Sequence, residues 1–251
     1  MPYILEICQA GKTREVSKRY SSRYGKKDIS RGKNKAPTPE AQEKVNERMS
    51  ITNLRRLLNE NFGYKDIHLV LTYRKGDRPD PEQAKKNLEK FLRDLRRYFK
   101  KNDMELKYIA VTEYKDAAIH HHLVISSMDT RDLTDIWKHG KPRPTYLDDT
   151  GQYGQLAEYL VKQTRKTFRD PDSPCHKRWS ASTNLKKPKV SKRIITAANW
   201  KKEPEATKGY YLEKNSLVNG IHEITGMRYQ YYSMIKLEPP PPRERIRGSD
   251  R

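Results

Sequence analysis

The pattern of apolar and polar positions predicts alternating strands and helices in the middle of the chain. Residues 67–73 are mostly apolar and rich in β-formers, which is typical of a buried strand. Apolar side chains then recur at helical spacing over residues 84–99, directly after the capping sequence Asp80-Pro81-Glu82-Gln83. Residues 107–113 and 119–126 follow as two strands around a short polar turn, and their spacing predicts a β-hairpin.

Helices are also expected around these strands. Thr38-Pro39-Glu40 combines an N-cap residue, a proline at the first helical position and an acid, and predicts a helix that ends near Glu60. A short helix from residue 129 to 137, a strand over 143–147 and a helix over 155–167 complete the order. This order indicates an α+β fold, in which a central antiparallel β-sheet carries flanking helices. The apolar stripe of the first helix would consist of Val45, Met49, Leu54, Leu57 and Leu58.

The chain divides into four segments by composition. We expect a basic N-terminal arm and helix over 1–60, a core over 61–170, a basic and β-rich extension over 171–238, and a Pro-rich flexible tail over 239–251. The basic arm is either a solvated tail or a contact for a DNA backbone.

The net charge changes the picture, because it points to a partner. The 251 residues carry a formal charge of +21, and apolar residues make up only 34% of them. Such an excess of cations indicates a polyanion, most often nucleic acid, and disfavours a membrane surface. Between residues 176 and 202 there is no acid, and Trp179 and Trp200 lie among the cations. These two rings either stack on single-stranded nucleic acid or belong to the core.

The cysteines and the length of the apolar runs indicate the cellular environment that the sequence suits. Cys8 and Cys175 are far apart, so neither a disulfide framework nor a zinc finger is expected, and a reducing, cytoplasmic setting fits. We expect no signal peptide and no transmembrane helix, because no long apolar run occurs. The absence of a Gly-rich phosphate loop also argues against a fused helicase.

A histidine triplet is the strongest chemical signal. Alternation along a strand places His120 and His122 on one face and His121 on the other. Two imidazoles on one face, with Glu113 across the hairpin, would give a divalent metal two nitrogen ligands and a carboxylate and leave positions open for a phosphate. The triplet by itself is often incidental, and Glu113 would serve equally as a partner in a salt bridge.

A second motif lies on the helix expected over 155–167. Tyr159 and Lys162 are three residues apart and share a helix face, on which Lys166 lies one turn further. A phenol can attack phosphorus and hold a covalent intermediate, and a lysine can stabilise phosphate charge. Such a pair is common by chance, and either residue would serve as an ordinary surface or packing residue. Tyr153, six residues earlier, faces another direction and ranks below Tyr159.

The order of these motifs resembles the three-motif signature of the HUH endonucleases. Leu71-Thr72-Tyr73 ends a strand, a His-x-His strand follows, and a Tyr-x-x-Lys helix comes last. More narrowly, the chain is similar to the rolling-circle replication initiator (Rep) proteins of bacterial plasmids, phages and integrative elements. The basic segment from Arg178 to Pro188 resembles the one that follows the catalytic helix in Firmicute-type members. The resemblance covers roughly residues 61–190, and His121 stands where the family usually has a bulky apolar residue.

The resemblance implies a site- and strand-specific endonuclease that initiates rolling-circle replication of a mobile element. Tyr159 would nick single-stranded or hairpin origin DNA, leaving a 5′-phosphotyrosine and a free 3′-hydroxyl, and Lys162 would be the motif lysine. His120, His122 and Glu113 would bind Mg²⁺ or Mn²⁺. A host helicase and polymerase would be further partners, and no membrane is involved. DNA would be bound by Lys166, Lys177, Arg178, Lys186 and Lys187.

Two rival functions remain open. A conjugative relaxase or a single-tyrosine transposase would use the same chemistry, so the motifs do not separate these from a replication initiator. A noncatalytic DNA-binding protein on the same fold would bind DNA without cleaving it, and replacing Tyr159 would change nothing.

Overall fold

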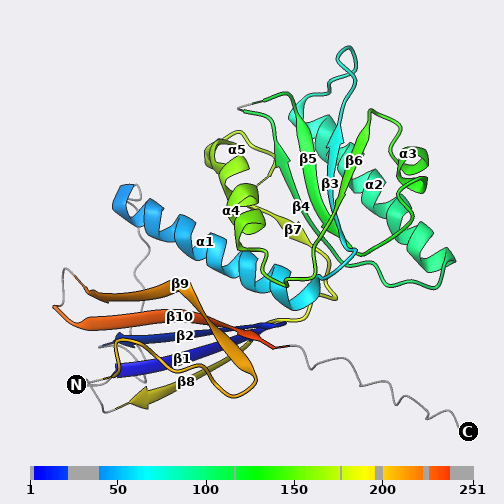
Figure 1. The fold of residues 1–251 in the computed structure, drawn as a ribbon. Coiled ribbons are helices and arrows are strands. Elements are labelled where there is room, and N and C mark those ends of the chain that lie inside the picture. Colours follow the sequence, from blue (N-terminus) through cyan, green and yellow to red (C-terminus); the bar gives the residue numbers. More distant parts are fainter. Residues whose placement is uncertain are drawn as a thin grey trace, which may run out of the picture. The chain divides into compact units, whose positions relative to one another are not determined.

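The computed structural model of the chain describes residues 3–21, 40–115, 117–175, 177–195, 200–222 and 226–237. The helix start at Thr38-Pro39, most of the expected basic arm and the Pro-rich tail lie outside these residues. Two five-stranded antiparallel sheets with several helices confirm the α+β class (Figure 1). The chain forms two compact units. The first consists of residues 1–8, 13–26 and 190–251, and the second of residues 9–12 and 27–189.

The second unit contains the strands that the apolar pattern predicts. Its sheet has the order β6-β3-β5-β4-β7, so the hairpin strands β4 and β5 pair directly and β3 lies on the other side of β5. The bounds of the strands are β3 Ile67–Thr72, β4 Tyr108–Glu113, β5 His120–Ile125, β6 Pro142–Tyr146 and β7 Ser180–Ala181.

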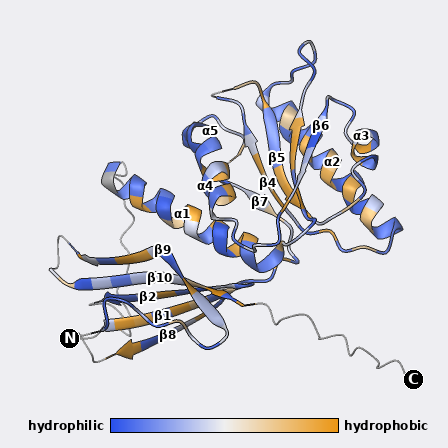
Figure 2. Cartoon of the chain, in the orientation of Figure 1, coloured by the Kyte–Doolittle hydropathy of each residue, from blue (hydrophilic) through white to orange (hydrophobic). Residues whose placement is uncertain are grey.

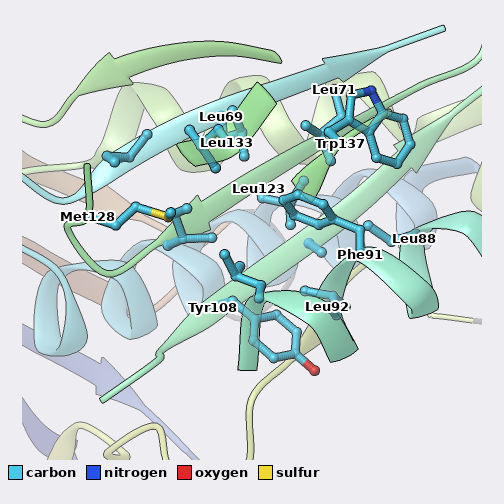
Figure 3. Close-up of a cluster of buried hydrophobic side chains, with 14 of the residues drawn as sticks. Leu69, Leu71, Leu88, Phe91, Leu92, Tyr108, Leu123, Met128, Leu133 and Trp137 are labelled. Atoms are coloured by element: carbon cyan, nitrogen blue, oxygen red, sulfur yellow. The ribbon is translucent and has the colours of Figure 1, made fainter. Parts of the chain in front are cut away.

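Both faces of this sheet are covered by apolar side chains. On one face, Leu69, Leu71 and Leu123 pack with Phe91 of α2 and with Trp137, which follows α3 (Figure 3). On the other face, strand residues such as Val111 and Val124 pack with side chains of α1 and α4. The helices of this unit are α1 Glu40–Asn61, α2 Pro81–Lys101, α3 Asp132–Ile136, α4 Gly154–Gln163 and α5 Arg165–Arg169.

Helix α2 forms where its capping sequence predicts. The backbone N–H of Gln83 donates to the Asp80 carboxylate at 2.7 Å, and Pro81 opens the helix, which presents one apolar face to the sheet (Figure 2). The stripe expected on α1 is only half correct. Leu54 and Leu58 are fully buried, whereas Val45 and Met49 are 41% and 58% exposed.

The helix expected over 155–167 is interrupted. Thr164 ends α4, and its hydroxyl donates to the carbonyl oxygens of Leu160 and Val161, each at 3.2 Å. A hydroxyl that satisfies carbonyls of the preceding turn in this way competes with the regular helix pattern. Lys166 therefore lies on the separate helix α5, and not one turn further along the face of Tyr159.

The first unit contains a sheet of the order β8-β1-β2-β10-β9. Residues 3–20 fall within the expected basic arm and form β1 and β2, and β2 pairs with β10. Some of the cations lie over aromatic rings, as Arg14 does at 4.4 Å from the centre of the Tyr210 ring. The bounds are β1 Tyr3–Ala10, β2 Thr13–Tyr20, β8 Lys189–Ile195, β9 Tyr210–Ile221 and β10 Arg228–Lys236. Across the described ranges, no helix has the length and apolar character that a membrane span requires.

A substitution at Gly140 tests how closely the loop before β6 must approach β3. A Cβ on Gly140 would lie 2.0 Å from the carbonyl oxygen of Thr72, which is a backbone atom and cannot rotate away. We expect Gly140→Ala to lower the free energy of unfolding by about 1–3 kcal/mol, the usual range for overpacking. Urea denaturation measures the change. Gly76→Ala is the matched control, because a Cβ at Gly76 meets nothing within 4 Å. Equal stability of the two variants would contradict the prediction.

Candidate active site

The register of β5 decides which histidines share a face. His120 pairs with Glu113 of β4 and with Thr72 of β3, and His122 pairs with Val111 and Val70. Directly opposed residues of antiparallel strands project from the same face. This face, which α1 and α4 cover further along, therefore carries His120, His122 and Glu113, as the sequence predicts.

The two site histidines lie close enough to share one cation. Nε2 of His120 is 3.0 Å from Nε2 of His122. Nδ1 of His120 lies 2.7 Å from the carbonyl oxygen of Ala118, and since a carbonyl only accepts, this nitrogen carries the proton and Nε2 keeps its lone pair. Two nitrogens at right angles, each about 2.1 Å from a metal ion, would be about 3.0 Å apart. The histidine pair thus fits two adjacent ligand positions.

His68 is a third histidine of the site, and the sequence analysis missed it. It projects from β3 onto the same face, and its Nε2 lies 3.3 Å from Nδ1 of His122. The two rings are stacked with their centres 5.5 Å apart. The second nitrogen of a metal-binding histidine usually has such a partner, which fixes the tautomer and the orientation of the ring. The only signal in the sequence was a polar residue in a run of buried strand residues.

His121 points to the opposite face and is fully buried in the core. Nδ1 lies 2.9 Å from the Thr112 hydroxyl and Nε2 lies 2.9 Å from the Tyr73 hydroxyl, so both ring nitrogens have partners. Burial lowers the pKa of His121 from 6.5 to about 3, and the imidazole is neutral at physiological pH. Of the three histidines of the triplet, His121 is therefore placed in the core and away from the site face.

Tyr159 of α4 reaches the histidines. Its hydroxyl lies 3.5 Å from Nε2 of His122, and the two rings meet edge to face with centres 5.2 Å apart. The helix is anchored by the buried residues Ala157, Leu160 and Val161, which leaves the Tyr159 side chain 41% exposed. Burial of the remainder raises the pKa of the Tyr159 phenol, so it is protonated at neutral pH.

Tyr153 is buried and supports the start of α4. It is 4% exposed, its hydroxyl donates to the carbonyl oxygen of Asp148 at 2.9 Å, and its backbone N–H donates to Asn59 at 2.9 Å. These contacts fix the start of α4 and leave the phenol no access to a substrate. Tyr159 is the better candidate nucleophile of the two.

Glu113 is near the histidines but is engaged elsewhere. The Thr167 hydroxyl donates to its Oε2 at 3.0 Å, and the backbone N–H of Lys115 donates to its Oε1 at 2.7 Å. Within the described ranges, no group of three or more His, Cys, Asp and Glu side chains is arranged to hold a metal ion. The histidine pair therefore fits a metal, while the carboxylate does not join it in this conformation.

The cations expected at the site lie at the surface of the second unit. Lys162 forms an ion pair with Glu158 at 2.6 Å, one helical turn before it. Lys166, Lys177, Lys186 and Lys187 are exposed, whereas Arg178 is half-buried. Asn61 binds both the backbone N–H and the carbonyl of Lys186, which holds this basic segment against the end of α1.

A comparison with protein families adds a link to replication. Residues 66–168, less than half of the chain, match the family model described as replication-associated protein ORF2/G2P. The matched span runs from the start of β3 to α5 and contains His120, His122, Glu113, Tyr159 and Lys162. The match supports a replication initiator, with DNA as its partner. No curated protein and no solved structure matches the chain significantly.

The role of His121 can be tested by His121→Phe. The variant keeps an aromatic ring but removes both contacts to the Tyr73 and Thr112 hydroxyls, so we expect the free energy of unfolding at pH 7.5 to fall by about 1–3 kcal/mol. A histidine whose pKa falls from 6.5 to about 3 on folding stabilises the fold fully above pH 6.5, and this stability is lost as the pH falls toward 3.

The variant should therefore lose less stability than the wild type between pH 7 and pH 5. Urea denaturation at both pH values, with EDTA present, measures this difference. If the stability of the variant changed with pH as that of the wild type does, His121 would not be a buried neutral group.

Proposed function

We propose that the chain is a metal-dependent endonuclease of the HUH type that nicks one strand of DNA to initiate rolling-circle replication. The observation that carries the proposal is the meeting of three groups on one sheet face. The phenol of Tyr159 lies 3.5 Å from Nε2 of His122, which lies 3.0 Å from Nε2 of His120. A phosphate bound beside the histidine nitrogens would have a tyrosine hydroxyl next to its phosphorus.

The proposed step is an attack by the Tyr159 oxygen on the phosphorus of a phosphodiester. A bond forms between this oxygen and phosphorus, and the bond from phosphorus to the 3′ oxygen breaks. The phenol loses its proton, and the departing 3′ oxygen gains one. A divalent metal held by His120 and His122 would polarise the phosphate and stabilise its charge when bound.

The residues of the chain contribute position and charge. Packing of Leu160 and Val161 fixes α4, which holds the Tyr159 hydroxyl beside His122. Nδ1 of His120 is occupied by the Ala118 carbonyl, which keeps Nε2 available as a ligand. Lys162 lies on the exposed side of the same helix, and a DNA strand would compete with Glu158 for its ammonium group.

The nucleophile is tested with single-stranded DNA fragments of the replicon that encodes the chain, incubated with Mn²⁺ or with EDTA. We expect a covalent adduct that needs Mn²⁺ and that disappears in Tyr159→Phe, because the phenol oxygen forms the new bond. A 3′ label should stay with the protein, and a 5′ label should leave on a shorter strand that a polymerase can extend. A denaturing gel resolves the products.

Tyr153→Phe is the matched control and should form the adduct as the wild type does, because its hydroxyl binds the Asp148 carbonyl. Tight DNA binding with no adduct in any variant would instead favour a noncatalytic DNA-binding protein on the same fold. An adduct that persists in Tyr159→Phe would assign the nucleophile to another residue.

The metal ligands are tested by the affinity for Mn²⁺ without DNA, measured from the electron paramagnetic resonance signal of the free ion. We expect His122→Ala to weaken binding by more than about 10-fold, because one of two fitted ligands is lost. Glu113→Gln should leave the affinity unchanged without DNA, because Thr167 and Lys115 hold both oxygens of the carboxylate. His121→Phe should bind as the wild type does, because His121 lies on the other face. A weaker affinity in Glu113→Gln would show that the carboxylate binds the ion without DNA, and unchanged affinity in His122→Ala would contradict the proposed site.

A further inference from the structure

A cavity of about 420 Å³ lies in the second unit, beside the edge of β4 that is remote from β5. Its apolar wall comes from α2 and from β4, through residues such as Leu88, Leu92 and Ala110. Its polar wall is basic and includes Lys85, Arg96, Lys177 and Arg178, with Glu89 as an acidic member. A second cavity of about 430 Å³ shares Phe168, Lys177, Arg178 and Trp179 with the first.

Arg178 lies in the wall that the two cavities share, and one end of its guanidinium has no acceptor. Nη1 is buried, and it is the one buried side-chain nitrogen or oxygen without a hydrogen-bond partner among the residues that the structure describes. The guanidinium carbon lies 4.5 Å from the centre of the Phe168 ring, so the ring supports one face of the group. A buried donor without an acceptor is unfavourable, and an absent ion or water is one of its explanations in native proteins.

The nearby acids do not satisfy this donor. Glu47 acts on Arg178 electrostatically, but its carboxylate accepts its hydrogen bond from Arg165. Glu43 pairs with Arg169 at 2.7 Å. Burial is the largest influence on the pKa of Arg178 and lowers it, which is the effect of a charge held where water is scarce. The site therefore offers a desolvated cation beside aromatic rings and apolar side chains.

We propose that these cavities bind one nucleotide of a single DNA strand, with its phosphate on the guanidinium group of Arg178 and its base against the aromatic side chains of Phe168 and Trp179. This proposal deepens the proposed function and rests on it for the choice of DNA as the ligand. A guanidinium donates well to phosphate, and a base can stack on an aromatic ring whatever its sequence. The basic wall complements the charge of the strand.

One residue connects this nucleotide site with the candidate active site. Thr167 lines the first cavity, and its hydroxyl donates to Oε2 of Glu113. A strand that displaces α5 on entering the cavity would remove the Thr167 contact from Oε2 of Glu113 and leave the Lys115 contact on Oε1. Binding of DNA would thereby loosen the acid that the sequence predicts as a third metal ligand.

The test uses the full chain, fluorescein-labelled (dT)₁₂ and an abasic strand with the same number of phosphates. Fluorescence anisotropy gives Kd over a series of salt concentrations. We expect Arg178→Met to weaken binding of (dT)₁₂ and to reduce the slope of log Kd against log salt by about 0.7, the value for one phosphate contact on a single strand. Phe168→Leu should weaken (dT)₁₂ by about fivefold or more and leave the abasic strand unchanged.

Arg93→Gln is the matched control, because it removes a guanidinium from the exposed side of α2 that lines neither cavity. It should leave the slope unchanged. A structural role for Arg178 is separated by thermal denaturation. Since its buried donor has no partner, Arg178→Met should keep or raise Tm, whereas loss of a stabilising contact would lower it.

An Arg178→Met variant that binds like Arg93→Gln, or that melts several degrees below the wild type, would overturn the proposal. Equal affinity of the wild type for (dT)₁₂ and the abasic strand would overturn the base-binding part. The nuclease activity fails or succeeds separately, because Tyr159→Phe abolishes the adduct without touching this site. Arg178-dependent binding without an adduct would support the nucleotide site and refute the nuclease.

Discussion

The register of β5 between β3 and β4 is the constraint on which the candidate site depends. The alternation of a strand allows only two arrangements, and a slip by one residue would bring His121 to the site face and bury His120 and His122. The side chains of the buried face determine which of these two registers forms. Leu123 and Ile125 fill the core on the side of α2, and His121 binds hydroxyls of both neighbouring strands or their ends. The face that carries His120 and His122 is thus held in place by interactions on the opposite face of the sheet.

Much of the second unit could be predicted because its signals are local. Strand alternation, the Asp80 cap and the apolar spacing of α2 are properties of a few consecutive residues, and the structure confirms each of them. The first unit was harder to predict, because its strands are defined by distant partners. Lys18 of β2, for example, binds Gln230 of β10, which is 212 residues away. No pattern within a few consecutive residues predicts such a pairing. The sequence of a basic strand is therefore interpreted as a basic arm.

The same distinction applies to the site. The opposition of His120 and Glu113 follows from a hairpin, and the structure has it in register. His68 was missed because it lies on another strand, 54 residues before the histidine that it contacts. The actual partners of the Glu113 carboxylate depend on Thr167, whose position depends in turn on the break after α4. At that break the Thr164 hydroxyl binds two carbonyl oxygens of the preceding turn, a contact that the helical pattern of the sequence does not reveal.

The acids of α1 neutralise part of the basic surface of a chain that carries a charge of +21. Glu47 and Glu43 form ion pairs with Arg165 and Arg169 of α5, and these pairs join α1 to the helix that follows α4. Individually, partly exposed pairs contribute little, about 1 kcal/mol at most. These ion pairs nevertheless show which arginines of this region already have an acidic partner and which one does not. Arg165 and Arg169 have carboxylates as partners, whereas Nη1 of Arg178 is buried without one among the described residues. Of these three arginines, Arg178 is therefore the one with a hydrogen-bond donor left for a DNA phosphate.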